Sequence, residues 1–137
     1  MQTQTNYLNE QFDVKLKNLH FDTYELKLFN YTNIAVSTVL NVNNEVLTSG
    51  QKIMNQRLSM ARSVAWYIYK KLSGESSRSV AKLYKINHVT VCNSIHCVQF
   101  MVAQKTENTL KTQLELIDKI NTIETVLKQK LSLYQSK

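Results

Sequence analysis

Residues 59–98 carry three runs of helical apolar spacing separated by two tight breaks, and this pattern restricts the fold more than any other part of the chain. The inward positions of the last two runs are apolar: Val80, Ala81, Tyr84, Ile86, Val91 and Ile95. Ser76 or Ser77 can cap the second helix and Asn87 the third, because short polar side chains accept hydrogen bonds from free N–H groups. This combination predicts a helix-turn-helix, a motif that places its second helix in the major groove of DNA. An ordinary three-helix core that binds no nucleic acid is the alternative.

The segment around these runs also favours helices. One apolar stripe precedes the breaks and comprises Ala61, Val64, Ala65, Ile68 and Leu72. It ends at Ser73 and Gly74, and residues 52–58 before it form a basic connector. The chain has only one other Gly, at position 50, and no Pro. Because a turn-rich β fold needs both residue types, this composition predicts a mainly α fold.

The first part of the chain permits two interpretations. Residues 1–6 are polar and are expected to be loose. Between residues 12 and 29 apolar and polar residues alternate as in a short hairpin, yet some of them also share one helical face. A lone hairpin is only marginally stable, so a helix is preferred there and a hairpin is the alternative. A further helix is expected over residues 33–40, and a turn that leads into a short helix over residues 42–47.

The C-terminal residues 108–134 contain no helix breaker. Their apolar residues recur every three or four positions: Leu110, Leu114, Ile117, Ile120, Ile123, Leu127, Leu131 and Tyr134. At about 1.5 Å per residue such a helix would extend for roughly 40 Å, which exceeds the width of one small helical domain. Its far half therefore needs a covering surface. Either residues 8–40 of the same chain or a second copy in a homodimer would provide one.

The length of 137 residues suggests one compact domain. We divide it into an N-terminal packing segment (1–49), a basic core (50–105) and a C-terminal helix (106–137). No apolar run approaches the roughly 20 residues of a membrane span, and the N-terminus does not resemble a signal peptide. Cys92 and Cys97 lie five positions apart in one predicted helix and would point in different directions. These features predict a cytoplasmic protein with reduced thiols and no membrane partner.

The net charge of +7 is concentrated in the core segment. Residues 50–105 carry nine Lys and Arg against Glu75 alone, whereas residues 1–49 are net acidic. A basic field confined to one segment is typical of a phosphate-binding face, so we expect double-stranded DNA as the partner. The side chains expected to contact DNA phosphates are Lys52, Arg57, Arg62, Lys70, Ser76, Ser77, Arg78, Lys82 and Thr90.

The last predicted helix of this segment has a candidate reading face. Its core positions are Val91, Ile95 and Val98. A rotation of about 100° per residue places Val89 and Asn93 on the opposite side, with His96 at the border. Val89 would suit a thymine methyl group, and Asn93 would suit a bidentate contact with adenine. These residues are therefore candidates for base readout.

The run ARSVAWYIYKKLSGESSRSVAKLY, followed by NHVTV at residues 87–91, resembles the C-terminal DNA-binding domain of the chromosomal replication initiator DnaA. That family has an Arg in the stripe of its first helix, as at Arg62, and a tyrosine-bearing helix that ends like Leu72-Ser73. Its signature Asp-His-[Ser/Thr]-Thr-Val is matched by Asn87-His88-Val89-Thr90-Val91. The resemblance covers about residues 33–102.

The resemblance implies a Trp-repressor-like helix-turn-helix and assigns base contact to His88, at the start of the reading helix. Asn87, which caps that helix, is a further candidate for base readout. It implies a role in replication initiation or its regulation in a bacterium, phage or mobile element. Asn87 and Val89 stand where the family has an aspartate and a hydroxyl residue. The chain has no G-x-x-x-x-G-K-[ST] sequence, so no nucleotide is expected.

Other chemistry has little support. His88, Cys92 and His96 lie near one helical face, which zinc would accept, but no fourth ligand is evident. We therefore expect no metal and no cofactor. We also expect no enzymatic activity, because a catalytic Cys-His pair would need a buried acid or an oxyanion element and neither is evident. The alternatives to a replication protein are a helix-turn-helix transcriptional regulator and a protein-interaction module that has lost DNA binding.

Overall fold

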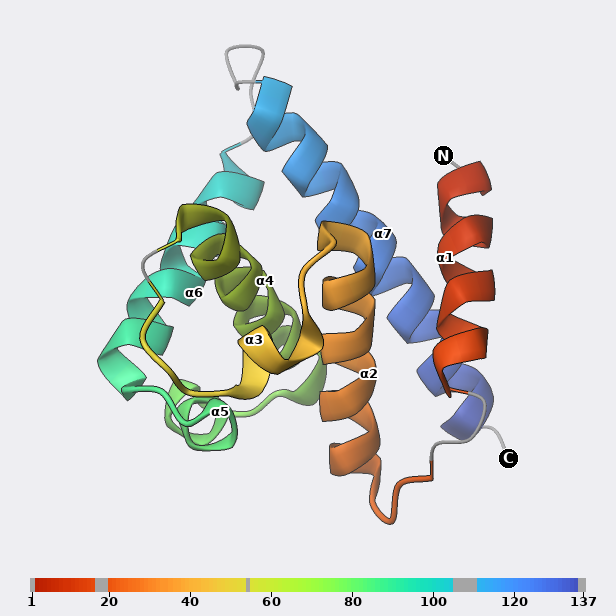
Figure 1. Ribbon diagram of the computed structural model, residues 1–137, viewed down its shortest axis with the longest axis horizontal. Helices are drawn as coiled ribbons and strands as arrows, with labels where there is room; N and C mark the ends of the chain where they lie inside the picture. Colours follow the sequence, from red (N-terminus) through yellow and green to blue (C-terminus); the bar gives the residue numbers. More distant parts are fainter. Residues whose placement is uncertain (1, 17–19, 54, 105–110, 136–137) are drawn as a thin grey trace.

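The computed structural model describes residues 2–16, 20–53, 55–104 and 111–135. Their regular structure is entirely helical, so the expectation of a mainly α fold is confirmed. The helices are α1 (Gln2–Leu16), α2 (Tyr24–Leu40), α3 (Asn44–Thr48), α4 (Gln56–Ser73), α5 (Ser77–Tyr84), α6 (His88–Ala103) and α7 (Lys111–Gln135). They form two groups (Figure 1), with α1, α2 and α7 on one side and α4, α5 and α6 on the other. The packing of α2 against α4 joins the groups, and the short α3 packs on both of these helices.

The N-terminal segment differs from the expectation in two respects. Helix α1 begins at Gln2, so residues 2–6 are not a loose tail. Helix α2 begins at Tyr24, nine residues earlier than expected, and the hairpin alternative is wrong. A strand would have placed Leu26 and Leu28 on one face, but the helix leaves Leu26 46% exposed and buries Leu28. The Thr23 side chain caps this helix by accepting a hydrogen bond from the Leu26 N–H (3.1 Å).

The α5–α6 pair follows the predicted pattern closely. The predicted inward residues Val80, Ala81, Tyr84, Val91 and Ile95 are buried, and Ile86 packs partly buried against the core. The Ser76 hydroxyl accepts from the Ser79 N–H (3.2 Å), and Asn87 Oδ1 accepts from the Val89 N–H (2.8 Å). Both predicted caps are therefore present. Residues 85–87 connect the two helices.

Helix α4 contains the predicted apolar stripe but is longer than expected. It begins at Gln56, within the expected connector, because Asn55 Oδ1 caps it by accepting from the Leu58 N–H (3.1 Å). It ends at Ser73, where Gly74 adopts a left-handed conformation (φ 74°) and its N–H donates to the Lys70 carbonyl. The stripe is buried except for its last member, Leu72, which is half-buried. Trp66, also on α4, is buried with its ring edge-on to that of Tyr84.

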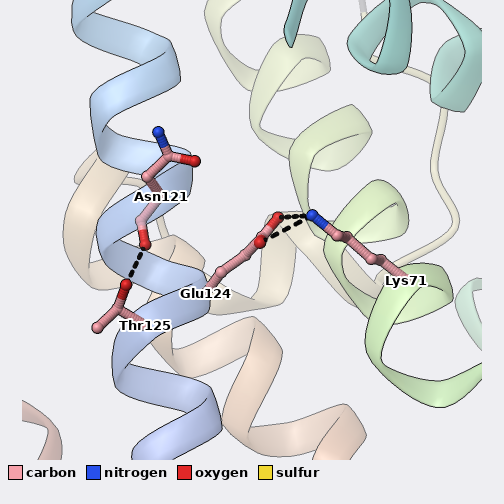
Figure 2. Close-up of polar contacts among 4 residues, drawn as sticks. All are labelled: Lys71, Asn121, Glu124 and Thr125. Carbon is pink, nitrogen blue, oxygen red and sulfur yellow. Dashed lines mark hydrogen bonds and ion pairs between the residues drawn. The ribbon is translucent and has the colours of Figure 1, made fainter. Parts of the chain in front are cut away.

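Helix α7 packs on its own chain, against α1 and α2 (Figure 1). Its buried face consists of Ile117, Ile120, Ile123, Val126, Leu127 and Leu131. The buried Glu124 accepts two hydrogen bonds from Lys71 Nζ on α4, at 3.0 and 3.2 Å (Figure 2). Lys130 forms an ion pair with Asp13 of α1.

The apolar stripe of α7 is therefore covered by α1 and α2 of the same chain, which is the first of the two alternatives given by the sequence. Residues 108–110, which were included in the expected helix, lie outside the described ranges. Self-association through residues 108–134 stays a prediction, and it would have to use the exposed remainder of α7. Within the described ranges, no helix combines the length and the apolar character needed to cross a bilayer.

Candidate nucleic-acid interface

Helix α6 presents one buried side and one exposed side. Its predicted core residues Val91, Ile95 and Val98 have exposed fractions of 0%, 1% and 2%. On the opposite side Val89 is 53% exposed, and Asn93 and His96 are exposed as well. None of these three side chains forms a hydrogen bond with another described residue. The predicted reading face is therefore open to solvent and free to bind.

The first turn of α6 is partly occupied by its own cap. Asn87 is exposed, but its Oδ1 already accepts the Val89 N–H. Its amide Nδ2 donors and the second lone pair of Oδ1 remain available for a base. His88, at the first position of the helix, is half-buried, and the next hydroxyl, on Thr90, is exposed.

Several predicted phosphate contacts are exposed cations. Arg78 and Lys82 project from α5, and Lys52 lies in the loop between α3 and α4. None of the three forms an ion pair with the described residues, so each charge is available to a partner. Arg57 is exposed too, but its guanidinium donates a hydrogen bond to the carbonyl of Asn41, which holds the side chain against the end of α2.

The two predicted serines differ in their surroundings. Ser76 is exposed, and its hydroxyl is engaged in capping α5. Ser77, the first residue of α5, is half-buried. Both lie at the N-terminus of that helix, where free backbone N–H groups favour anions.

Arg62 differs from the other predicted phosphate contacts because its side chain is buried. It is only 5% exposed, and its guanidinium points into the fold. Nε donates to the carbonyl of Val46 (2.9 Å), and NH2 donates to the hydroxyl of Ser49 (3.1 Å). Burial lowers the pKa of this guanidinium because desolvation penalises its charged form. Arg62 therefore ties α3 to α4, and it also lines a cavity.

That cavity collects several of the predicted residues. It has a volume of about 430 Å³ and lies between the loop before α4, the start of α4 and the start of α6. Of the sequence-predicted residues it brings together Lys52, Arg62, Asn87 and Thr90. Lys85, in the turn between α5 and α6, also lines the cavity. The sequence analysis did not include it among the expected phosphate contacts, although its position immediately before Ile86-Asn87 already placed it in the predicted turn.

Lys70 lies apart from this group. It lines a smaller hollow of about 270 Å³ with Tyr67, Lys71, Gln99 and Val102. Gln99 is eleven residues beyond His88, which corresponds to about 16 Å along a helix. Lys70 therefore accompanies the C-terminal half of α6 and is not positioned beside the start of the predicted reading helix.

An exposed aromatic residue on α6 was also missed. The Phe100 side chain is 69% exposed, whereas the next most exposed aromatic residue of the described chain, Tyr24, is 36% exposed. It continues the line of Val89, Asn93 and His96 by helical spacing, and that spacing was the available signal. Cys92 and Cys97 of the same helix are free thiols, the first half-buried and the second exposed.

The chain elsewhere offers little other site chemistry. Among the described residues no three His, Cys, Asp or Glu side chains come close enough to hold a metal ion. This includes the set of His88, Cys92 and His96. Comparison with protein-family models and with curated proteins finds no match.

Proposed function

We propose that this protein binds double-stranded DNA, with α5 and α6 acting as a helix-turn-helix and α6 as its reading helix. The observation that carries this proposal is the division of α6. One side is buried on α4 and α5, while the side chains of Val89, Asn93 and His96 are exposed and form no hydrogen bond with another described residue. A helix that enters the major groove needs such a free polar and small-apolar face.

The electrostatics of the same region support the proposal. Lys52, Arg78 and Lys82 are exposed and unpaired with the described residues, and the segment 50–105 carries the excess positive charge of the chain. Free cations around a reading helix provide the sequence-independent part of DNA affinity. The resemblance to the DnaA DNA-binding domain favours a cytoplasmic role in replication or its regulation, and a transcriptional regulator would use the same surface.

A protein-interaction module is the second candidate, favoured by the exposed Phe100. The deciding experiment is fluorescence anisotropy with a labelled random duplex at 50 mM salt. The proposal predicts binding that weakens on the order of a hundredfold or more by 200 mM salt if about four to six phosphates are contacted, since each contributes about 0.9 to the log–log slope. Absence of binding at 50 mM salt would reject DNA as the partner.

A further inference from the structure

The cavity beside the start of α6 has a closely fitted wall. Gly50, in the loop before α4, adopts a φ of +75°, and its backbone rests on Lys85 in the turn before α6. A Cβ atom at position 50 would lie 2.9 Å from Lys85 Cβ and 3.0 Å from the Lys85 carbonyl oxygen. Loop and turn therefore meet without a gap, and together with α4 and α6 they line the cavity of about 430 Å³.

The charges around this cavity have one sign. Lys52, Arg62 and Lys85 line it, and no Asp or Glu is among the described residues of its wall. Lys52 and Lys85 come from two different connections and are exposed, so both can adjust to a ligand.

Arg62 is the most informative of the three cations. Its exposed fraction is only 5%. Both of its hydrogen bonds nevertheless go to uncharged acceptors, and it forms no ion pair with the described residues. Burying a cation without a counter-charge is costly, and buried charges in proteins are as a rule paired. An anion in the cavity would supply the missing partner.

The remaining wall supplies hydrogen-bond donors from two helices. Ser59 of α4 and Thr90 and Ser94 of α6 contribute hydroxyl groups. Asn87 and Thr90 belong to the first turn of α6, whose N-terminus adds a partial positive charge. Cations and hydroxyl donors arriving from several directions suit a tetrahedral oxyanion better than a flat carboxylate.

We propose that this cavity binds a phosphate group, with Arg62 as its buried counter-charge, Lys52 and Lys85 as its outer cations, and Thr90 and Ser94 as hydroxyl donors. The phosphate can belong to the DNA backbone or to a small phosphate-bearing molecule, because both present the same oxygens. Only the first source rests on the proposed DNA-binding function. In the second case the ligand would occupy the cavity beside the reading helix while DNA is bound.

Trp66 provides the measurement. It is the one tryptophan of the chain and part of the cavity wall, so its fluorescence and its indole N–H resonance report on occupancy. Inorganic phosphate is titrated into the full chain at pH 7, with sodium chloride holding the ionic strength constant. We expect a saturable change of both signals, and no such change when chloride replaces phosphate.

The variants test the assigned residues. Arg62→Gln is expected to weaken phosphate binding at least tenfold, and Lys85→Gln several-fold. Lys128→Gln removes a positive charge from an exposed position on α7 that does not line the cavity, and it should bind phosphate like the parent protein. Lys85→Gln keeps the test valid if Arg62→Gln does not fold. A parent protein without a saturable signal, or a Lys128→Gln loss as large as that of Lys85→Gln, would overturn the proposal.

A labelled duplex then separates the two sources. Displacement of phosphate by duplex assigns the cavity to a backbone phosphate, and simultaneous binding assigns it to a small molecule; both outcomes support the site. If phosphate saturates but duplex does not bind, the site stands and the DNA-binding function fails. If duplex binds parent, Arg62→Gln and Lys85→Gln equally and phosphate does not titrate, the site fails and the DNA-binding function stands.

Discussion

The backbone of Gly50 lies directly against Lys85, so the loop before α4 is fitted to the turn before α6. Both residues have positive φ, 75° and 61°. Lys85 ends α5 in the left-handed conformation, and its N–H donates to the Lys82 carbonyl, which frees the chain to turn into α6. The orientation of the proposed reading helix therefore depends on a contact that lies 35 residues apart in the sequence.

The first prediction compares two glycine variants. Gly50→Ala and Gly74→Ala both place a side chain at positive φ, which costs about 1–2 kcal/mol. Only Gly50→Ala adds a collision, because a Cβ at Gly74 meets nothing within 4 Å. We expect Gly50→Ala to lower the free energy of unfolding, measured by urea titration, by more than Gly74→Ala does. Equal losses would show that the loop can move away from Lys85.

The second prediction concerns a buried hydrogen bond between the two helix groups. The Tyr84 hydroxyl on α5 donates to Asn33 Oδ1 on α2 (2.6 Å), and both side chains are buried. Asn33 Nδ2 has no partner among the described residues, so the Asn33 amide depends on this one bond. Tyr84→Phe is expected to cost about 1–3 kcal/mol, because it leaves a buried acceptor unsatisfied.

A double-mutant cycle supplies the control. Asn33→Leu alone leaves the Tyr84 hydroxyl without its acceptor, whereas Tyr84→Phe with Asn33→Leu removes both polar groups. The double variant should therefore lose less stability than the sum of the single variants. Tyr69→Phe is the matched single change, since that buried tyrosine forms no hydrogen bond with a described residue, and it should cost less than Tyr84→Phe. Additive losses in the cycle would contradict the coupling.

The local features of this chain were predictable from its sequence. The caps Ser76 and Asn87 and the buried side of α6 depend on residues within one or two turns, and helical spacing encodes them directly. The segment around Leu26 was ambiguous for a physical reason. Its apolar residues fit both a strand period and a helical period, and only packing against α1, α4 and α7 distinguishes the two.

Long-range features were not predictable in the same way. The sequence marks Arg62 as one more cation of a basic segment, but its burial depends on Val46 and Ser49, which are brought to it by the turn between α3 and α4. The stripe of α7 shows that a covering surface is needed without showing which one. The cavity collects residues from three segments, and no local pattern places Lys52 beside Lys85.

The third prediction concerns alkaline pH. Burial, with the nearby charges of Glu75 and Glu25, raises the pKa of Tyr69 to about 12. In the unfolded chain the same group ionises near pH 10, so above that pH the unfolded state releases its proton first. The stabilisation is present below pH 10 and is lost as the pH rises through 12. Urea titrations from pH 9 to 12 should show a shallower decline in the free energy of unfolding for Tyr69→Phe than for the parent.

Other groups contribute to the same alkaline decline. Burial also raises the pKa of Tyr84, and the hydrogen bond with Glu124 raises the pKa of Lys71. Tyr69→Phe should therefore reduce the slope without abolishing it. Identical slopes in the two proteins would mean that the Tyr69 hydroxyl reaches solvent in the folded state.

The fourth prediction concerns phosphate contacts made by α5. Arg78→Ala and Lys82→Ala should each weaken duplex binding by a similar factor on every sequence and reduce the log–log salt slope by about 1, since a phosphate contact carries no base information. Lys128→Ala is the matched control, because it removes an exposed cation from α7. Anisotropy at several salt concentrations measures the slope. An equal effect of Lys128→Ala would indicate that only net charge matters.

The last prediction concerns the bases that α6 reads. Asn93 is exposed on the open side of the helix, and His88 stands at its first position, the end that enters a groove. The preferred duplex is first selected from a random pool. On that duplex His88→Ala and Asn93→Ala should each cost about 1–3 kcal/mol of binding free energy, while binding to random duplex changes little. The measured quantity is the ratio of specific to random affinity.

Gln99→Ala serves as the control, since Gln99 is exposed on the same helix but lies near its other end. It should leave the ratio unchanged, and circular dichroism should show the same helix content in all three variants. If His88→Ala and Asn93→Ala reduce specific and random binding equally, α6 contributes charge and shape but no sequence readout. The reading face would then have to be sought around Lys52 and Lys85, two exposed cations that line the cavity beside the start of α6.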